Sequence, residues 1–143
     1  MTQSNSKATL SVTRFLWAAM IGSVLMVGSV LLFSKQSNTP PQVHKSLVYP
    51  AIGILGAMLL LGLTIRNAIW KNGRSPEGLV NPKAYANGIL VHMMMLDLAA
   101  TVSLVFAYLT RQLHPYLLLA GIALLLMLFN FPTGKPMFSD GAD

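Results

Sequence analysis

The sequence predicts an all-α membrane protein, one domain of four transmembrane helices in an up-down bundle. Hydrophobic residues make up 54% of the 143 residues, charged residues only 10%, and the mean hydropathy is +0.60. That balance is too apolar for a water-soluble domain of this size. The apolar residues also gather in four runs of helical length, separated by polar segments rich in proline, glycine and charge, which is typical of loops between membrane helices.

The first predicted span covers residues 15–33. Its 19 residues are all apolar or small and lie between Arg14 and Lys35, which suits one crossing of a hydrocarbon core about 30 Å thick. The run is longer than the roughly 7 to 15 residues of a secretory signal core, and no A-x-A cleavage pattern follows it. We therefore interpret it as a membrane span and not as a signal peptide.

The second predicted span covers residues 47–65. Tyr49-Pro50 stands at its start, and a proline is tolerated in the first helical turn because the N–H that it lacks would have no helical partner there. Gly53, Gly56 and Gly62 lie within this span. Small residues let membrane helices approach closely, so we expect these three glycines to serve helix packing.

The third span, residues 84–110, has 27 residues and is long enough to tilt or to project into the interface. The fourth, residues 116–131, is the shortest, and Pro132 ends it. The short link 111–114 predicts an antiparallel hairpin of these two spans. The chain outside the four spans is predicted to be flexible at both termini.

The distribution of Lys and Arg predicts the orientation. Seven lie at the N-terminus, in the segment between the second and third spans and in the tail, and three lie on the other side; they are Lys7, Arg14, Arg66, Lys71, Arg74, Lys83 and Lys135 against Lys35, Lys45 and Arg111. By the positive-inside rule, both termini and the loop before Lys83 face the cytoplasm. These basic residues have no interleaved aromatic residues, so we predict no nucleic-acid partner.

Asp97 is the most informative residue of the chain, because the nearest other formal charges in its run are Lys83 and Arg111 at the two ends. In a helix those charges lie roughly 20 Å away on either side, which puts Asp97 near the bilayer midplane. An ionisable side chain there costs about 2.5 to 3.5 kcal/mol on insertion scales, so it is paired, turned into a protein interior, or titrating in function. Thr101 is the nearest hydroxyl on the same helix face. Asp97 and Thr101 are thus a candidate ion-binding pair, with interhelical hydrogen bonding as the structural alternative.

Several classes of function are excluded. The chain has no Cys, and its three His, at 44, 92 and 114, have no metal-ligand spacing. We therefore predict no metal site and no cofactor. No nucleophile, base and oxyanion donor can be assembled from the residues present, so we predict that the protein is not an enzyme.

Part of the chain, about residues 51–110, resembles the hairpin of the rotary ATP synthase c subunit, or proteolipid. The resemblance is carried by Ala51-Ile-Gly-Ile-Leu-Gly-Ala, by Arg74-Ser-Pro-Glu77 and by Met95-Leu-Asp97-Leu-Ala99. It implies that Arg74, Pro76 and Glu77 form a cytoplasmic loop motif and that Asp97 is the ion-carrying carboxylate. It also implies a location in the bacterial inner membrane.

Two functions remain open. The first is a small accessory or structural subunit of a larger membrane complex, c-subunit-like in ancestry, with Asp97 joining helices by hydrogen bonding. The alternative is a component that translocates protons or sodium through Asp97. The sparse glycines and the two additional spans favour the accessory subunit. Its expected partners are membrane lipid and either other membrane subunits or copies of itself.

Overall fold

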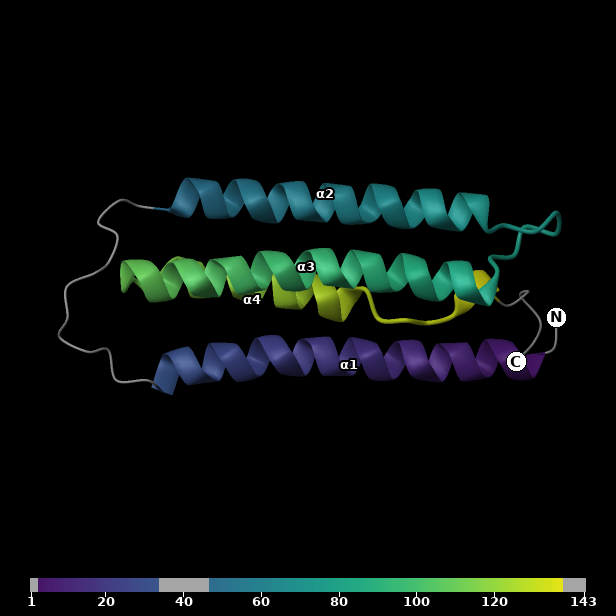
Figure 1. Cartoon of the computed structure of the whole chain (residues 1–143), viewed down its shortest axis with the longest axis horizontal. Coiled ribbons are helices and arrows are strands. Elements are labelled where there is room, and N and C mark those ends of the chain that lie inside the picture. Colours follow the sequence, from purple (N-terminus) through teal and green to yellow (C-terminus); the bar gives the residue numbers. More distant parts are fainter. Residues whose placement is uncertain (1–2, 34–46, 138–143) are drawn as a thin grey trace.

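The computed structural model describes residues 3–33 and 47–137, and most of these residues lie in helices (Figure 1). Its elements are α1 (Gln3–Phe33), α2 (Val48–Asn72), α3 (Pro82–Thr110), α4 (Tyr116–Phe129) and the short 3-10 helix η1 (Lys135–Met137). No strand forms in the described part of the chain, where the only β pairing is an isolated bridge between Arg74 and Val80. The predicted all-α fold is confirmed.

Three helices, α1, α2 and α3, are long and apolar enough to cross a membrane. α1 and α2 continue beyond the predicted spans, to Gln3 at one end and to Asn72 at the other. The physical reason is that the apolar run marks only the part of a helix that needs lipid, whereas the backbone hydrogen bonds extend into polar sequence. Of the ends predicted to be flexible, residues 1–2 and 138–143 lie outside the described residues, as does the predicted loop over residues 35–45.

The helix at the fourth predicted span is shorter than the other three. α4 has 14 residues, which at 1.5 Å per residue gives about 21 Å, short of a hydrocarbon core about 30 Å thick. Asn130 caps its end, where the Asn130 N–H donates to the Leu126 carbonyl at 3.2 Å. Residues 131–134 then run without helical structure to η1, because Pro132 cannot continue the helix. α4 is therefore a short apolar helix and does not meet the length of a full span.

α3 is the centre of the fold. Figure 1 shows α1 and α2 on opposite sides of α3, and α4 also packs against it. In the most apolar part of each helix, 44% of residues are buried in α3, against 11% in α1 and 17% in α2. The fully buried large side chains include Tyr85, Leu96 and Leu104 from α3 with Tyr116 and Met127 from α4. Each of the other helices thus depends on α3 for most of its contacts.

The connection between α2 and α3 is a tight turn. Asn81 precedes α3, and its side-chain oxygen accepts from the Lys83 N–H at 3.0 Å, with Pro82 in the first helical position. Gly78 has a φ of 86°, a conformation that glycine adopts without steric cost. The Asn81 N–H donates to the Gly73 carbonyl at 2.9 Å and closes the loop. α2 and α3 therefore form a helical hairpin.

Candidate functional site

α3 is covered on three sides and open on the fourth. At 100° per residue its buried residues point toward α1, α2 and α4. The open side is a row of exposed residues that we name the Asp97 face, because the half-buried Asp97 lies at its border with α1. It consists of Met94, Leu98, Thr101, Val105 and Tyr108. The spacing of 4, 3, 4 and 3 residues is that of a helix–helix seam.

Asp97 has one described polar neighbour, Ser23 of α1. The Ser23 hydroxyl lies 3.4 Å from the Asp97 Oδ1 oxygen, long for a hydrogen bond between oxygens. The same hydroxyl lies 2.8 Å from the Met20 carbonyl. A hydroxyl carries a single proton, so the two acceptors compete for it and the closer carbonyl is favoured. Asp97 is consequently held in place only weakly by its own chain.

Thr101 lies one turn beyond Asp97 and is exposed. Within the described residues no hydrogen bond joins the two side chains, and no group of three or more His, Asp or Glu residues could hold a metal ion. The structure thus places Thr101 on the same exposed side as Asp97, without direct contact between them.

The loop residues Arg74, Pro76 and Glu77 are exposed in the α2–α3 turn. This turn precedes Pro82, the first residue of α3, and Asp97 lies 15 residues further along the helix, or about 22 Å. The loop motif and Asp97 therefore lie far apart along α3.

The three glycines of α2 have different surroundings. A Cβ built on Gly53 or Gly56 would meet nothing within 4 Å, whereas a Cβ on Gly62 would lie 2.6 Å from His92 Nδ1 and 3.4 Å from the His92 Cα. Gly62 therefore allows the close approach of α2 to α3, while Gly53 and Gly56 leave room for a Cβ within the described part of the chain. Gly88 of α3, which the sequence analysis did not single out, has a similar role, because a Cβ there would lie 2.7 Å from Trp70 Cδ1.

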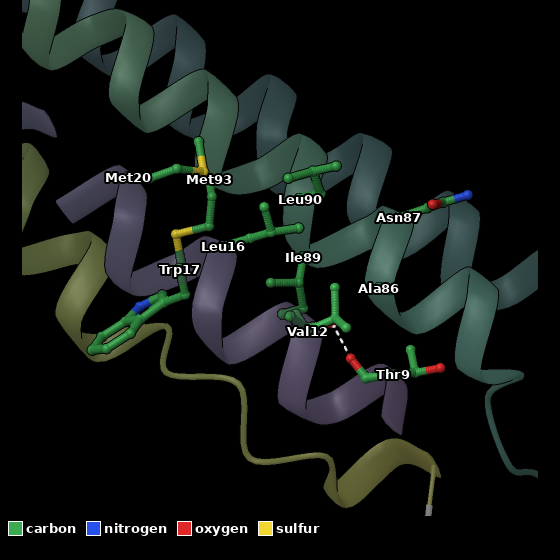
Figure 2. Close-up of a pocket in the computed structure, with 11 residues that line it drawn as sticks. Thr9, Val12, Leu16, Trp17, Met20, Ala86, Asn87, Ile89, Leu90 and Met93 are labelled. Atoms are coloured by element: carbon green, nitrogen blue, oxygen red, sulfur yellow. Dashed lines mark hydrogen bonds between the residues drawn. The ribbon is translucent and has the colours of Figure 1, made fainter. Parts of the chain in front are cut away.

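A groove between α1 and α3 leads toward Asp97. It has a volume of ≈ 150 Å³, and Figure 2 shows Thr9 and Asn87 at one end and Met20 and Met93 at the other. Ser23 follows Met20 by three residues and Asp97 follows Met93 by four, which is one helical turn in each helix. The groove, named here the α1–α3 groove, thus ends one turn before the Ser23–Asp97 contact.

A second polar cluster lies on the opposite side of α3, where α2 meets the end of α4. The Arg66 Nη1 donates to the Asn130 side-chain oxygen at 3.0 Å, and the guanidinium carbon lies 4.9 Å from the centre of the Trp70 ring. Trp70 stacks on Tyr85 with ring centres 5.6 Å apart. A cation beside the C-terminus of a helix is favourable because of the helix dipole. These contacts fix the end of α4 against α2 and α3.

The segment after α4 is also held from α1. The Arg14 Nε donates to the Pro132 carbonyl at 3.1 Å, and the Trp17 Nε1 donates to the Met127 carbonyl at 2.9 Å. Trp17 further meets the Phe131 ring edge-on at 5.0 Å. The sequence analysis uses Arg14 and Arg66 only to predict the orientation. No spacing signal predicts these contacts, because each joins residues that lie far apart in the sequence.

The fold and the apolar surface define the class of protein. Three candidate spans, with large apolar side chains exposed along them, indicate an integral membrane protein, since a row of such side chains is stable only against lipid or another protein. We find no match to this chain among protein-family models, curated proteins or solved structures. The resemblance to the c subunit therefore stays a prediction.

Proposed function

We propose that the protein is a small accessory subunit of a larger membrane complex and that it binds a transmembrane helix of a partner over the Asp97 face. α1, α2 and α3 cross the membrane in alternating directions, and α4 enters from the far side and ends within it. Both termini and the α2–α3 turn face the cytoplasm, on the charge distribution given above. The membrane is the bacterial inner membrane, as the c-subunit resemblance implies.

One observation carries this proposal: Asp97 is half-buried at mid-helix, and within the described residues its side chain makes a hydrogen bond only at 3.4 Å, to Ser23. A carboxyl at that depth is costly unless it is hydrogen-bonded. Because Ser23 is shared with the Met20 carbonyl, the chain itself does not meet this need. A hydrogen-bond donor on a neighbouring helix would supply the partner that the Asp97 carboxyl needs.

The Asp97 face supplies the remaining surface for such a partner. Met94, Leu98, Val105 and Tyr108 are 47–55% exposed and recur at the spacing of a two-helix seam. We expect a partner helix with small or apolar residues along the seam and one hydroxyl, amide or basic side chain at the level of Asp97. In this arrangement α3 contributes the contact surface, and α1 and α2 flank the docked helix.

The alternative function is translocation of protons or sodium through Asp97. The α1–α3 groove favours it, because the groove extends from the start of α3 to within one turn of the carboxyl. The Ser23 oxygen, with its own proton directed to Met20, is free to accept a hydrogen bond from a protonated Asp97. In this alternative the groove is an access path and the chain assembles in several copies.

Copy number separates the two functions. We would purify the tagged protein from native membranes in mild detergent and determine the intact mass by native mass spectrometry. An accessory subunit gives one copy beside unlike subunits, whereas a translocating ring gives many copies of this chain. A homo-oligomeric mass would overturn the accessory proposal.

Variants at Asp97 supply the second test. Asp97→Asn keeps a hydrogen-bonding group and should retain the partner, while Asp97→Leu should lower partner recovery about fivefold, as expected for loss of roughly 1 kcal/mol. Leu118→Ala, at an exposed site on α4, is the matched control and should have no effect. Loss of ion transport in Asp97→Asn, with assembly intact, would instead favour translocation.

A further inference from the structure

The α1–α3 groove has a gradient of polarity along its length. At the end near the start of α3 its lining includes two polar residues, Thr9 from α1 and Asn87 from α3, beside Val12 and Ala86. Deeper in the groove the walls are Leu16 and Met20 on one side and Leu90 and Met93 on the other, as Figure 2 shows. Leu90 and Met93 lie about 12 and 17 Å from the start of α3. The lining of the groove thus becomes more apolar in the direction that leads from the membrane surface to the membrane interior.

The apolar part of the groove is suited to hydrocarbon and not to water. A buried water needs two to four polar partners, and apolar cavities of about 150 Å³ stay dry and take up apolar molecules. Leu16 is 40% exposed, so the groove opens sideways to whatever surrounds the bundle. In a bilayer the surrounding molecules are lipids, and an acyl chain can enter from the side.

A basic side chain stands at the polar end. Lys83 is exposed and lies one turn before Asn87 on the same side of α3. This is also the end that the charge distribution places at the cytoplasm, where the leaflet carries anionic lipids and each nearby Lys contributes about 1 kcal/mol of attraction. A phosphate at this level would meet the Lys83 ammonium and the Asn87 amide together.

We propose that the α1–α3 groove binds one acyl chain of an anionic phospholipid whose headgroup is held by Lys83 and Asn87. The end of the acyl chain then lies at Met20 and Met93, one turn from the Ser23–Asp97 contact. A bound lipid in this position separates Asp97 from the polar end of the groove. This inference rests on the proposed orientation and not on the partner helix, so either can fail without the other.

Native mass spectrometry of the detergent-solubilised protein with added phosphatidylglycerol or phosphatidylcholine tests the proposal. We expect about fivefold more bound phosphatidylglycerol, the ratio that about 1 kcal/mol gives. Lys83→Gln should remove this preference, and Lys71→Gln, also exposed and at the same end of the bundle, should keep it. Equal binding of the two lipids by the unchanged protein would overturn the role of Lys83.

The apolar part of the groove is tested by filling it. Leu90→Phe and Leu16→Phe, which enter from opposite walls, should each abolish binding of both lipids, whereas Leu60→Phe at an exposed site on α2 should not. Circular dichroism checks that each variant keeps its helices. Lipid binding that persists in both folded groove variants would overturn the proposal, as would a polypeptide found bound in the groove.

Trp17 offers an independent readout, because it lines the groove. In a Trp70→Phe background it is the only tryptophan of the chain. Phospholipids brominated along the acyl chain should quench its fluorescence, more strongly when the headgroup is phosphatidylglycerol than when it is phosphatidylcholine. If both lipids quenched the Trp17 fluorescence equally, and Leu90→Phe left that quenching unchanged, only bulk lipid would reach Trp17. This result would overturn the specific site.

Discussion

The two sides of α3 differ in how firmly they are closed. Toward α2, Gly62 and Gly88 bring the helices into close contact, Arg66 bonds Asn130 at 3.0 Å, and Trp70 stacks on Tyr85. Toward α1, a groove opens between the helices, and Ser23 meets Asp97 across it only at 3.4 Å. The contacts on the α2 side therefore fix the fold, whereas the α1 side leaves polar and apolar groups available to other molecules.

The largest expected effect on stability is on the side of α3 that faces α2, at Gly62. Gly62→Ala places a Cβ 2.6 Å from Nδ1 of the buried His92 ring and 3.4 Å from the His92 backbone, so either this ring or α2 must shift. Overpacking of this kind costs about 1 to 3 kcal/mol. We expect a loss of that size in the free energy of unfolding, measured by denaturant titration in mixed micelles.

Gly53→Ala is the matched control in the same helix, because nothing lies within 4 Å of its Cβ. Alanine is favoured over glycine inside a helix by roughly 0.5 to 1 kcal/mol, so this variant should be neutral or slightly stabilised. Equal destabilisation of both variants would contradict the distinction between the two glycines.

An effect of similar size is expected at Arg66. Arg66→Met removes the bond to Asn130 and the contact with the Trp70 ring, and hydrogen bonds to charged groups are worth about 1.5 to 3 kcal/mol. Chemical denaturation should show a loss of unfolding free energy in that range. Arg74→Met, exposed in the α2–α3 turn, should stay within about 0.5 kcal/mol of the unchanged protein. If both variants lost the same stability, Arg66 would not fix the end of α4.

The smallest effect is expected on the side of α3 that faces α1. A double-mutant cycle of Ser23→Ala with Asp97→Asn should give a coupling energy below about 1 kcal/mol, since hydrogen bonds between membrane helices average about 0.6 kcal/mol. Ser29→Ala serves as the control, because the Ser29 hydroxyl bonds the Leu25 carbonyl of its own helix. A coupling well above 1.5 kcal/mol would mean that the α1 side is closed as firmly as the α2 side.

The sequence predicted the all-helical fold and the location of three apolar helices, because each is encoded by the composition of one continuous run. α4 shows the limit of that reasoning. Its apolar run has only 16 residues up to Phe131, and at 1.5 Å per residue a helix of that length is about 24 Å long, less than a hydrocarbon core about 30 Å thick.

The polar contacts could be predicted only in part. Rotation along one helix predicts that Thr101 lies on the face of Asp97, because both residues belong to one continuous run, and in the structure Thr101 is exposed one turn beyond Asp97. Ser23, Arg66 and Asn130 were missed because their roles arise only when different helices are brought together. His92 is a related case: it is fully buried against Gly62, and neither ring nitrogen has a hydrogen-bond partner among the described residues. We have no physical account of that arrangement.

The hydrogen bonds that hold the segment after α4 run through its main-chain atoms. Pro132 and Pro136 contribute carbonyl oxygens, to Arg14 and to the Val80 N–H, and Gly134 contributes its N–H to the Tyr85 hydroxyl. Every residue type offers a carbonyl, and every type except proline offers an N–H. These hydrogen bonds therefore do not depend on the residue types along the segment, whereas the buried Pro132 and Met137 and the Phe131 ring also hold it through their side chains. A related protein can keep the hydrogen bonds while the exposed Thr133 and Lys135 change.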